Sequence, residues 1–464
     1  ARYNQPLYVA VKTRQQVAAA EGKVTVDFYL INEKNVRGNH QLKISVTDYQ
    51  GKVMEVGTYE TEAAGGEVYG QLLVKDVKIP VPTAGGLCRI EAKLCKENSV
   101  VTTGYDDILS VNLASNMLDG KGAVWEDGSA LQNFLKGKTK EAVAAYEDNL
   151  GKLDWIMVAR PPRKDQLTMV PMEALRSADG KPGLDVVYYE DMEFQKEVYH
   201  EVAKVVNLSA IEGATPSPFV YMLDGYGIKW SGKVLPSVSG EYTIIPQSND
   251  RSMIEVFVNG KKIYEITRKK EHLGDGKVYL EGGKSADIEI RFRHPRSNAR
   301  CRLDWAVPND KMPDAQRLME RAVNDGTKIF IIQSADEWSE FIAANSKAVF
   351  KDKFFVGTNW LGGVMFNKPH DIFKELPVGN ALNWPYQALI HTGVERMGLV
   401  MEGEELLVGA YHTYPMAIGT AMGIVPMGKG SVLFSTLDIY GNIINDSAAG
   451  LVAKKLIFNM IDFK

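Results

Sequence analysis

Paired carboxylates would be the clearest sign of chemistry in this chain, because hydrolysis of a glycosidic bond needs two of them held on a rigid scaffold. The densest acidic cluster is Glu190, Asp191 and Glu193, which we interpret as a solvated surface run. A (β/α)8 barrel would need about 250 residues of alternating strands and helices, and the chain has no such block. We therefore predict no catalytic residue.

Nucleophilic and metal chemistry are also poorly supported by the sequence. A thiol nucleophile needs a histidine that is activated by a carboxylate. No cysteine follows Cys301 in the sequence. The later histidines are followed two positions on by Ile, Gly or Tyr rather than by Glu, and these are His370, His391 and His412. A Gly-x-Ser-x-Gly motif is absent, which argues against a serine hydrolase. The seven histidines are scattered singly, so the spacing of metal ligands is missing.

One glycine-rich stretch matches most of a phosphate-binding loop. Residues Gly423–Lys429 have the Gly-x4-Gly-Lys spacing, but Gly430 stands where a Ser or Thr should follow. The stretch also lies between two strand-like runs, with no helix after it whose N-terminus could hold phosphate. We interpret it as a tight turn.

A polar loop is the best candidate for ligand binding. Glu241–Ile245 has a strand pattern that should end at Pro246, and Met253–Val258 has another, so Gln247–Arg251 should be an exposed loop. Such a loop offers donors and acceptors to sugar hydroxyls. The candidate carbohydrate-binding residues are Ser248, Asn249 and Asp250, with Trp360 and Trp384 as aromatic faces for stacking. The alternatives are a polar turn whose side chains bond their own backbone, and aromatics that pack under their loops.

The N-terminal quarter of the chain has an all-β pattern. Val24, Val26, Phe28 and Leu30 alternate with other residues, and Leu42–Val46 repeats this period of two. Alternation with a period of two is typical of half-buried strands. Short strands about every ten residues predict an immunoglobulin-like β-sandwich over residues 1–112.

The rest of the chain predicts an α/β domain with a parallel sheet, interrupted by an inserted β domain. Apolar runs at Gly122–Glu126 and Leu153–Val158 flank a short helical pattern, whereas Asn259-Gly260 predicts a hairpin within a β-rich region. After Pro308 the α/β pattern resumes, with a helix stopped by Gly326, a strand at Lys328–Gln333 and a capping box between Ser334 and Glu337. The expected parts of the α/β domain are 115–175 and 310–464, with residues 181–308 inserted as a β-barrel and strands from both parts sharing one sheet.

Composition excludes two classes of partner. The 54 basic and 58 acidic residues give a net charge of -4, which leaves no surplus of cations for nucleic-acid phosphates. No apolar stretch is long enough to span a membrane.

The sequence begins Ala1-Arg2 without a signal segment. Its three cysteines do not form a disulfide framework.

The opening segment resembles the region that follows the catalytic barrel in bacterial glycoside hydrolases of family 2, the β-galactosidase-like group. The residues that carry this resemblance are Tyr3–Tyr8, Val24–Glu33, Gly66–Val74 and Thr103–Asp107. The split α/β domain resembles the amidotransferase-like domain of some of these hydrolases, through Gly428–Gly430 and Ser435–Asp438.

The inserted region resembles the protective-antigen-type domain, a β-barrel found inside glycosidases and adhesins. The matching residues are Pro182–Leu184, Tyr188-Tyr189, Ile228–Gly232, Ser239–Thr243, Ser248–Asp250, Val258–Gly260 and Leu303–Trp305. In adhesin relatives, two adjacent Asp residues hold a calcium ion that coordinates sugar. The matching pair here is Asn249-Asp250, so one carboxylate is missing. Asp250 is therefore only a weak metal candidate, and no cofactor is expected.

These resemblances imply a non-catalytic accessory region of a periplasmic or extracellular glycoside hydrolase. The family's carboxylate pair belongs to a barrel that is absent from this chain. The expected partners are an oligo- or polysaccharide and that barrel in the parent chain. The alternative function is a purely structural or homo-oligomerising segment without a ligand.

Overall fold

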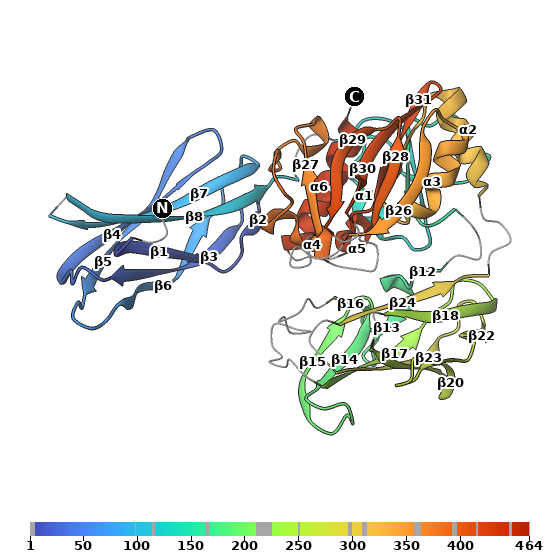
Figure 1. Cartoon of the computed structure of the whole chain (residues 1–464), viewed down its shortest axis with the longest axis horizontal. Coiled ribbons are helices and arrows are strands. Elements are labelled where there is room, and N and C mark those ends of the chain that lie inside the picture. Colours follow the sequence, from blue (N-terminus) through green and yellow to red (C-terminus); the bar gives the residue numbers. More distant parts are fainter. Residues whose placement is uncertain are drawn as a thin grey trace. The chain divides into compact units, whose positions relative to one another are not determined.

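A computed structural model describes residues 5–97, 99–113, 117–162, 167–209, 225–248, 251–295, 299–308, 313–356, 363–391, 397–413, 416–444 and 448–463 (Figure 1). The chain divides into two compact units. The first unit contains Ala1–Asn116, Lys368–Gln387 and Asn445–Lys464, and the second contains Met117–Asn367 and Ala388–Ile444. Most of the regular structure is β, as the sequence predicts.

The first unit is built around a β-sandwich. A three-stranded sheet has the order β1-β3-β6, and a five-stranded sheet has the order β2-β8-β7-β4-β5. Val24, Val26, Phe28 and Leu30 are fully buried in the core, which confirms the predicted period of two in this strand. The strands are β1 (Leu7–Thr13), β2 (Val17–Ala19), β3 (Lys23–Asn32), β4 (Gly38–Thr47), β5 (Val53–Ala63), β6 (Gly70–Pro80), β7 (Gly86–Lys96) and β8 (Ser99–Val111).

The C-terminal helix belongs to this first unit. Helix α6 (Ala448–Asp462) packs against β2 and β8 and against the short helix η3 (Asp371–Phe373). The buried Lys455 ammonium of α6 contacts the Glu375 carboxylate at 2.6 Å and donates to the backbone oxygen of Asn112 at 3.2 Å. The sequence analysis assigned the residues of α6 to the second part of the α/β domain, 310–464. The domain boundaries given there remain a prediction.

The second unit contains one mixed sheet with the order β10-β9-β11-β25-β31-β30-β28-β26, and a branch in which β29 pairs with β30 and β27. Strands β10, β9, β11, β25 and β31 are parallel to one another, whereas β30, β28, β26, β29 and β27 join by antiparallel pairing. Trp155 pairs with Gly122 on one side and with Lys328 on the other. The prediction that strands from before and after the insert share one sheet is therefore confirmed.

The strands of this mixed sheet are β9 (Gly122–Glu126), β10 (Ala144–Ala145), β11 (Trp155–Ala159), β25 (Lys328–Ile331), β26 (Val349–Phe355), β27 (Gly363–Asn367), β28 (Met397–Glu402), β29 (Glu405–His412), β30 (Ala417–Met427) and β31 (Gly430–Ser435). The helices that accompany it are α1 (Ala130–Leu135), α2 (Ala315–Asp325), α3 (Ala335–Ala344) and α5 (Ile439–Ile443), whereas the short helix η1 (Met172–Ala174) contributes Ala174 to the core of the insert. Helix α4 (Gln387–His391) and the short helix η4 (Trp384–Tyr386) lie at and before the boundary between the two units.

Local signals explain how three of these elements begin or end. Asp314 caps α2 by accepting hydrogen bonds from the N–H groups of Gln316 and Arg317, and Gly326 ends the helix at a φ of 79°. Gly428, at a φ of 58°, makes the tight turn between β30 and β31 that the sequence predicted in place of a phosphate loop. The predicted capping box of α3 is wrong: Ser334 adopts a left-handed conformation (φ 54°, ψ 35°), and its side chain does not cap the helix.

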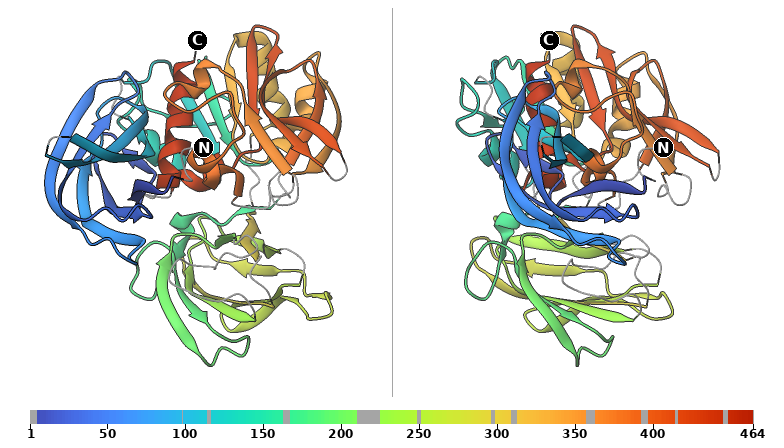
Figure 2. Two further views of the ribbon diagram at one scale, coloured as in Figure 1. Left: turned by 60° about the vertical axis from the view of Figure 1, so that its left-hand side comes forward. Right: turned by 90° about the vertical axis from the view of Figure 1, so that its left-hand side faces the viewer.

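The insert contains two sheets that lie face to face (Figure 2). A five-stranded sheet has the order β12-β24-β18-β22, with β16 on β24, and an eight-stranded sheet has the order β15-β14-β17-β23-β19-β20-β21, with β13 on β17. Asn259 and Gly260, at φ angles of 49° and 75°, join β19 to β20, which confirms the predicted hairpin. Trp230, Tyr242, Phe292 and Trp305 contribute the large side chains of its core.

The strands of the insert are β12 (Thr168–Met169), β13 (Leu175–Arg176), β14 (Leu184–Tyr189), β15 (Glu197–Ala203), β16 (Asn207–Ser209), β17 (Tyr226–Val234), β18 (Gly240–Ser248), β19 (Met253–Val258), β20 (Lys261–Ile266), β21 (His272–Leu273), β22 (Lys277–Leu280), β23 (Ala286–His294) and β24 (Arg300–Ala306).

Candidate functional site

The predicted sugar-binding loop begins later than the sequence indicated. Strand β18 continues past Pro246 to Ser248, because Pro246, Gln247 and Ser248 pair with Leu303, Arg302 and Cys301 of β24. The predicted end of this strand at Pro246 is therefore wrong. Ser248 is half-buried at the last position of the ladder. Asn249, Asp250 and Trp360 lie outside the described residues.

A buried polar cluster, formed by Tyr226, Ser252 and His294, lies at the same end of the insert. Ser252 follows the predicted loop and is 3% exposed, while His294 ends β23 and is fully buried. The Ser252 Oγ and His294 Nδ1 atoms are joined by a hydrogen bond of 3.1 Å. The imidazole stacks on the Phe292 ring with the ring centroids 5.9 Å apart, and the Tyr226 ring is 6.3 Å away.

Tyr226 is the unsatisfied member of this cluster. The residue is 1% exposed, and its hydroxyl has no hydrogen-bond partner among the residues that the structure describes. Burial raises the pKa of the Tyr226 phenol, and proximity to Cys301 raises it further. Burial likewise raises the pKa of the Cys301 thiol. Both groups therefore stay protonated at neutral pH, and neither is prepared to act as a nucleophile.

The sequence analysis missed this cluster, although a signal for part of it was present. Ile288, Ile290, Phe292 and His294 alternate along one strand, so the period of two places His294 on the buried face. A histidine at an inward position needs a hydrogen-bond partner. The identity of that partner, Ser252, depends on the pairing of β23 with β19 and is not visible in the local pattern.

Trp384 falls in a different compact unit from the predicted loop. It is the first residue of η4 and is half-buried in the first unit, whereas Ser248 belongs to the second. Two residues on, Tyr386 is buried, and its hydroxyl donates to the backbone oxygen of Pro377 at 2.6 Å. The assignment of Trp384 to a sugar site stays a prediction.

The acidic cluster of the insert has a structural role in a turn. The Asp191 carboxylate accepts hydrogen bonds from the backbone N–H groups of Glu193, Gln195 and Lys196 at 2.6–3.2 Å. These bonds shape the connection between β14 and β15. Such a carboxylate satisfies its own backbone rather than facing a second carboxylate across a substrate.

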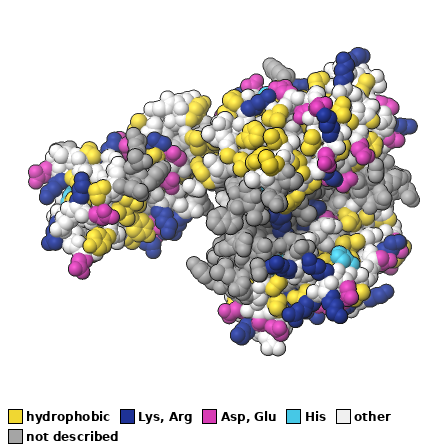
Figure 3. All heavy atoms as spheres, viewed as in Figure 1, with side chains coloured by type: hydrophobic (Ala, Val, Ile, Leu, Met, Phe, Trp, Pro, Cys, Tyr) yellow, Lys and Arg dark blue, Asp and Glu magenta, His cyan; other side chains and the backbone are white. Residues whose placement is uncertain are grey.

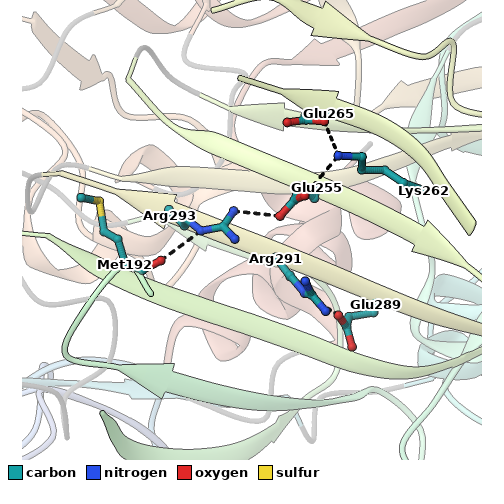
Figure 4. Close-up of polar contacts among 7 residues, drawn as sticks. All are labelled: Met192, Glu255, Lys262, Glu265, Glu289, Arg291 and Arg293. Atoms are coloured by element: carbon teal, nitrogen blue, oxygen red, sulfur yellow. Dashed lines mark hydrogen bonds and ion pairs between the residues drawn. The ribbon is translucent and has the colours of Figure 1, made fainter. Parts of the chain in front are cut away.

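Other carboxylates of the eight-stranded sheet are engaged in ion pairs (Figure 4). Glu255 contacts Arg293 at 2.9 Å and Lys262 at 3.3 Å, and Glu289 contacts Arg291 at 2.6 Å. Burial opposes the charge on Glu255, but the bonds from Arg293 and Lys262 outweigh it and lower the pKa of the carboxyl group. A paired carboxylate with a lowered pKa is ionised at neutral pH, so it is suited to stabilising the sheet and not to donating a proton.

Two tyrosine substitutions in the insert are expected to change its stability in opposite directions. Tyr226→Phe removes a buried hydroxyl that has no described partner, and should raise the free energy of unfolding by about 1 kcal/mol. Tyr242→Phe is the matched control: this hydroxyl is also buried, but it donates to the backbone oxygen of Val238 at 2.9 Å. Its loss should cost about 1–2 kcal/mol. Denaturant unfolding followed by tryptophan fluorescence measures both, and equal destabilisation would show that Tyr226 has a partner.

The described residues contain neither a candidate metal site nor a candidate membrane-spanning helix. Within the described ranges, His, Cys, Asp and Glu side chains do not gather into a group of three that could hold a metal ion. No helix in the described part of the chain is both long enough and apolar enough to cross a membrane.

Comparison with known proteins identifies the insert. Residues 180–317 match the family model of the PA14 domain, which confirms the resemblance of this region to the protective-antigen-type domain. The anti-sigma-I factor RsgI3 of Acetivibrio thermocellus is 28% identical over 127 residues, which are 27% of this chain and 19% of that protein. The chain thus spans about a fifth of the length of this curated relative.

Two solved structures illustrate weaker likenesses. A β-glucosidase from Kluyveromyces marxianus is 12% identical, with 49% of this chain and 30% of that chain covered at a TM-score of 0.34. A PA14 sugar-binding domain from an RTX adhesin is 14% identical, with 26% of this chain and 88% of that chain covered at a TM-score of 0.22. At these TM-scores neither likeness bears on how the chain functions.

Proposed function

We propose that the insert binds carbohydrate at the end where β18 stops at Ser248, and that the chain is an accessory region of a β-galactosidase-like glycoside hydrolase. The match of residues 180–317 to the PA14 domain carries this proposal. The resemblance of the opening segment to the region after a family 2 catalytic barrel supports the hydrolase context. A periplasmic or extracellular location follows from the same resemblance.

The polar character of this end of the insert also supports sugar binding. Ser248 and Arg251 bound the predicted loop, and Asn249 and Asp250 supply an amide and a carboxylate between them. Sugar recognition requires a few well-placed donors and acceptors beside an ordered scaffold. The ladder between β18 and β24 provides that scaffold up to Ser248.

The test is calorimetry of the whole chain with galactose-containing oligosaccharides, comparing Asp250→Ala with the unchanged protein. We expect the substitution to weaken binding at least tenfold. Asp287→Ala is the matched control, because Asp287 lies near the opposite end of β23 from His294 and its carboxylate pairs with the exposed Lys233 at 2.7 Å. The control should bind normally. Equal affinity of Asp250→Ala and the unchanged protein would remove the loop from the site.

We also propose that this binding needs no metal ion. Calcium prefers several oxygen ligands with more than one carboxylate, and Asp250 is the one carboxylate in the sequence 247–251. Addition of a chelator should therefore leave the affinity unchanged. Loss of binding on chelation, restored by calcium, would contradict this part of the proposal.

Catalysis is assigned to a barrel outside this chain, since no pair of carboxylates in the sequence suits glycoside hydrolysis. Turnover of nitrophenyl glycosides by the purified chain would contradict that assignment.

The alternative function, an oligomerising segment, is favoured by an apolar patch over β27, β29 and β30 (Figure 3). Phe366, Met416 and Ile418 are 39%, 78% and 67% exposed there. Absence of sugar binding together with concentration-dependent association in sedimentation experiments would support this alternative.

A further inference from the structure

A polar hollow of about 340 Å3 lies between α1 and the segment that leads from this helix into β10. Its size is at the lower end of the range for small-molecule sites, about 300–1,000 Å3. Among the side chains on its walls that can form hydrogen bonds or ion pairs with a ligand are Gln132, Asn133, Lys136 and Glu141. These residues precede the insert in the chain, and the proposed function uses none of them.

Both walls of this hollow are held in place by hydrogen bonds. The Glu126 carboxylate accepts two backbone N–H groups of the first turn of α1, each at 3.0 Å. In the other wall, backbone hydrogen bonds of 2.9 Å join Leu118 to residues 138 and 140. The buried Thr139 hydroxyl donates to the backbone oxygen of Glu141 at 2.7 Å. A site whose walls are already ordered loses little conformational entropy when a ligand binds.

The hydrogen bonds of Asn133 determine which of its atoms a ligand can use. The Ser129 hydroxyl donates its one proton to the Glu173 carboxylate at 3.2 Å. This hydroxyl can therefore only accept from Asn133, whose Nδ2 atom lies 3.0 Å from Ser129 Oγ. The Asn133 Oδ1 atom is left as an acceptor for a ligand, because no other residue in the described part of the chain donates to it.

One ammonium group and one carboxylate line the hollow without pairing. Two neighbouring lysines are engaged elsewhere: the Lys138 Nζ atom lies 5.0 Å from the centroid of an aromatic ring of α1, and Lys140 pairs with Asp119 at 2.5 Å. The side chains of Lys136 and Glu141, by contrast, form no ion pair or hydrogen bond with any residue that the structure describes. Both charges are therefore available to a ligand.

We propose that this hollow binds an acidic saccharide, in which a uronic acid residue pairs its carboxylate with Lys136 and donates hydroxyl protons to Glu141 and Asn133. The proposal is independent of sugar binding by the insert.

The chemistry of the walls selects this class of ligand. Acceptors at three places, the Glu141 carboxylate, the Asn133 Oδ1 atom and the Gln132 amide oxygen, suit a ligand with several separate donors, and the hydroxyls of a sugar supply them. An amino acid would carry its donors on a single ammonium group. A neutral sugar would form no bond between two opposite charges with Lys136, and such bonds are about twice as strong as neutral ones.

The test is calorimetry of the whole chain with digalacturonate and with its neutral counterpart, α-1,4-galactobiose. The unchanged protein should bind digalacturonate about tenfold more tightly than galactobiose. Lys136→Gln keeps a long polar side chain but removes the charge, so it should abolish this preference. Lys138→Gln is the matched control, because it removes the same charge from a lysine that is engaged with an aromatic ring. It should keep the preference.

Asn133→Ala tests the contacts with sugar hydroxyls. It removes the Oδ1 acceptor without changing the charge of the hollow, so it should weaken the binding of both sugars by about fivefold. Equal affinities of the unchanged protein for the two sugars, or the absence of digalacturonate binding, would overturn the proposal. Tighter binding of L-serine than of digalacturonate would assign the hollow to a zwitterion and would also overturn it.

Asp250→Ala separates this site from the proposed function. It should leave the affinity for digalacturonate unchanged. Loss of digalacturonate binding in Asp250→Ala but not in Lys136→Gln would place the acidic sugar in the insert, and the present proposal would be wrong while the proposed function stands. A preference for digalacturonate that depends on Lys136 and not on Asp250 would support the proposal even if the insert binds no sugar.

Discussion

Replacing Asp127 with alanine is expected to lower the free energy of unfolding of the second unit by about 3–5 kcal/mol. Asp127 follows β9 and forms an ion pair with Arg160, which follows β11. Their side chains are 14% and 8% exposed. Thr168, at the start of β12, also donates its hydroxyl to the Asp127 carboxylate. One carboxylate therefore joins three segments of this unit.

The large effect arises from what the substitution would leave behind. Burial lowers the pKa of the Arg160 guanidinium, and the neighbouring Asp127 counteracts this by stabilising its charge. Without Asp127, the buried guanidinium would keep the backbone oxygen of Pro161 at 3.2 Å as an acceptor but would lose its ion pair with that carboxylate. Breaking a buried pair by removing one partner costs far more than the net contribution of the intact pair.

Tryptophan fluorescence during urea unfolding measures this change, since Trp125, Trp155 and Trp338 lie in the same unit. Glu281→Ala is the control, because it removes the carboxylate of the exposed pair between Lys284 and Glu281. Exposed pairs contribute little to stability, so the control should leave the unfolding midpoint unchanged. A midpoint for Asp127→Ala that equals the control value would show that the pair is not isolated from water.

The second large effect is expected for Gly104→Ala in β8, which should destabilise the first unit by about 3 kcal/mol. A Cβ atom at this position would lie 1.6 Å from the backbone oxygen of Val9. This obstacle is main chain, so rotation of a side chain cannot relieve the overlap. Strand β1 lies directly against β8 here, and the Thr102 hydroxyl donates to the backbone oxygen of Leu7 at 2.9 Å. The added methyl group should force β1 away from β8.

Gly57→Ala is the matched control in the same sandwich. A Cβ atom at Gly57, in β5, would meet the Tyr59 ring at 3.4 Å, which is ordinary van der Waals contact. Neither glycine has a positive φ, so the two substitutions differ mainly in available space. Hydrogen exchange of β1 amides should increase strongly in Gly104→Ala and remain unchanged in Gly57→Ala. Equal protection in the two variants would contradict the close approach of β1 to β8.

The sequence by itself determined those features that depend on neighbouring residues. Alternation of Val24, Val26, Phe28 and Leu30 predicted which face of β3 is buried, because successive strand side chains point to opposite faces. Asn259-Gly260 predicted the hairpin because these two residue types tolerate the positive φ angles of its turn. The end of α2 at Gly326 follows from the same tolerance. The resemblance of the insert to the PA14 domain was also present in short motifs along the chain.

Only the tertiary structure decided the features that depend on which distant segments pair. The local pattern predicted that the strand ends at Pro246, but pairing with β24 extends β18 to Ser248. The partner strand provides hydrogen-bond partners for backbone groups that the local pattern assigned to a loop. Ser252 and His294 meet because β19 and β23 pair, although the two residues are 42 positions apart. Register between distant strands is set by the packing of whole sheets, so no short stretch of sequence encodes it.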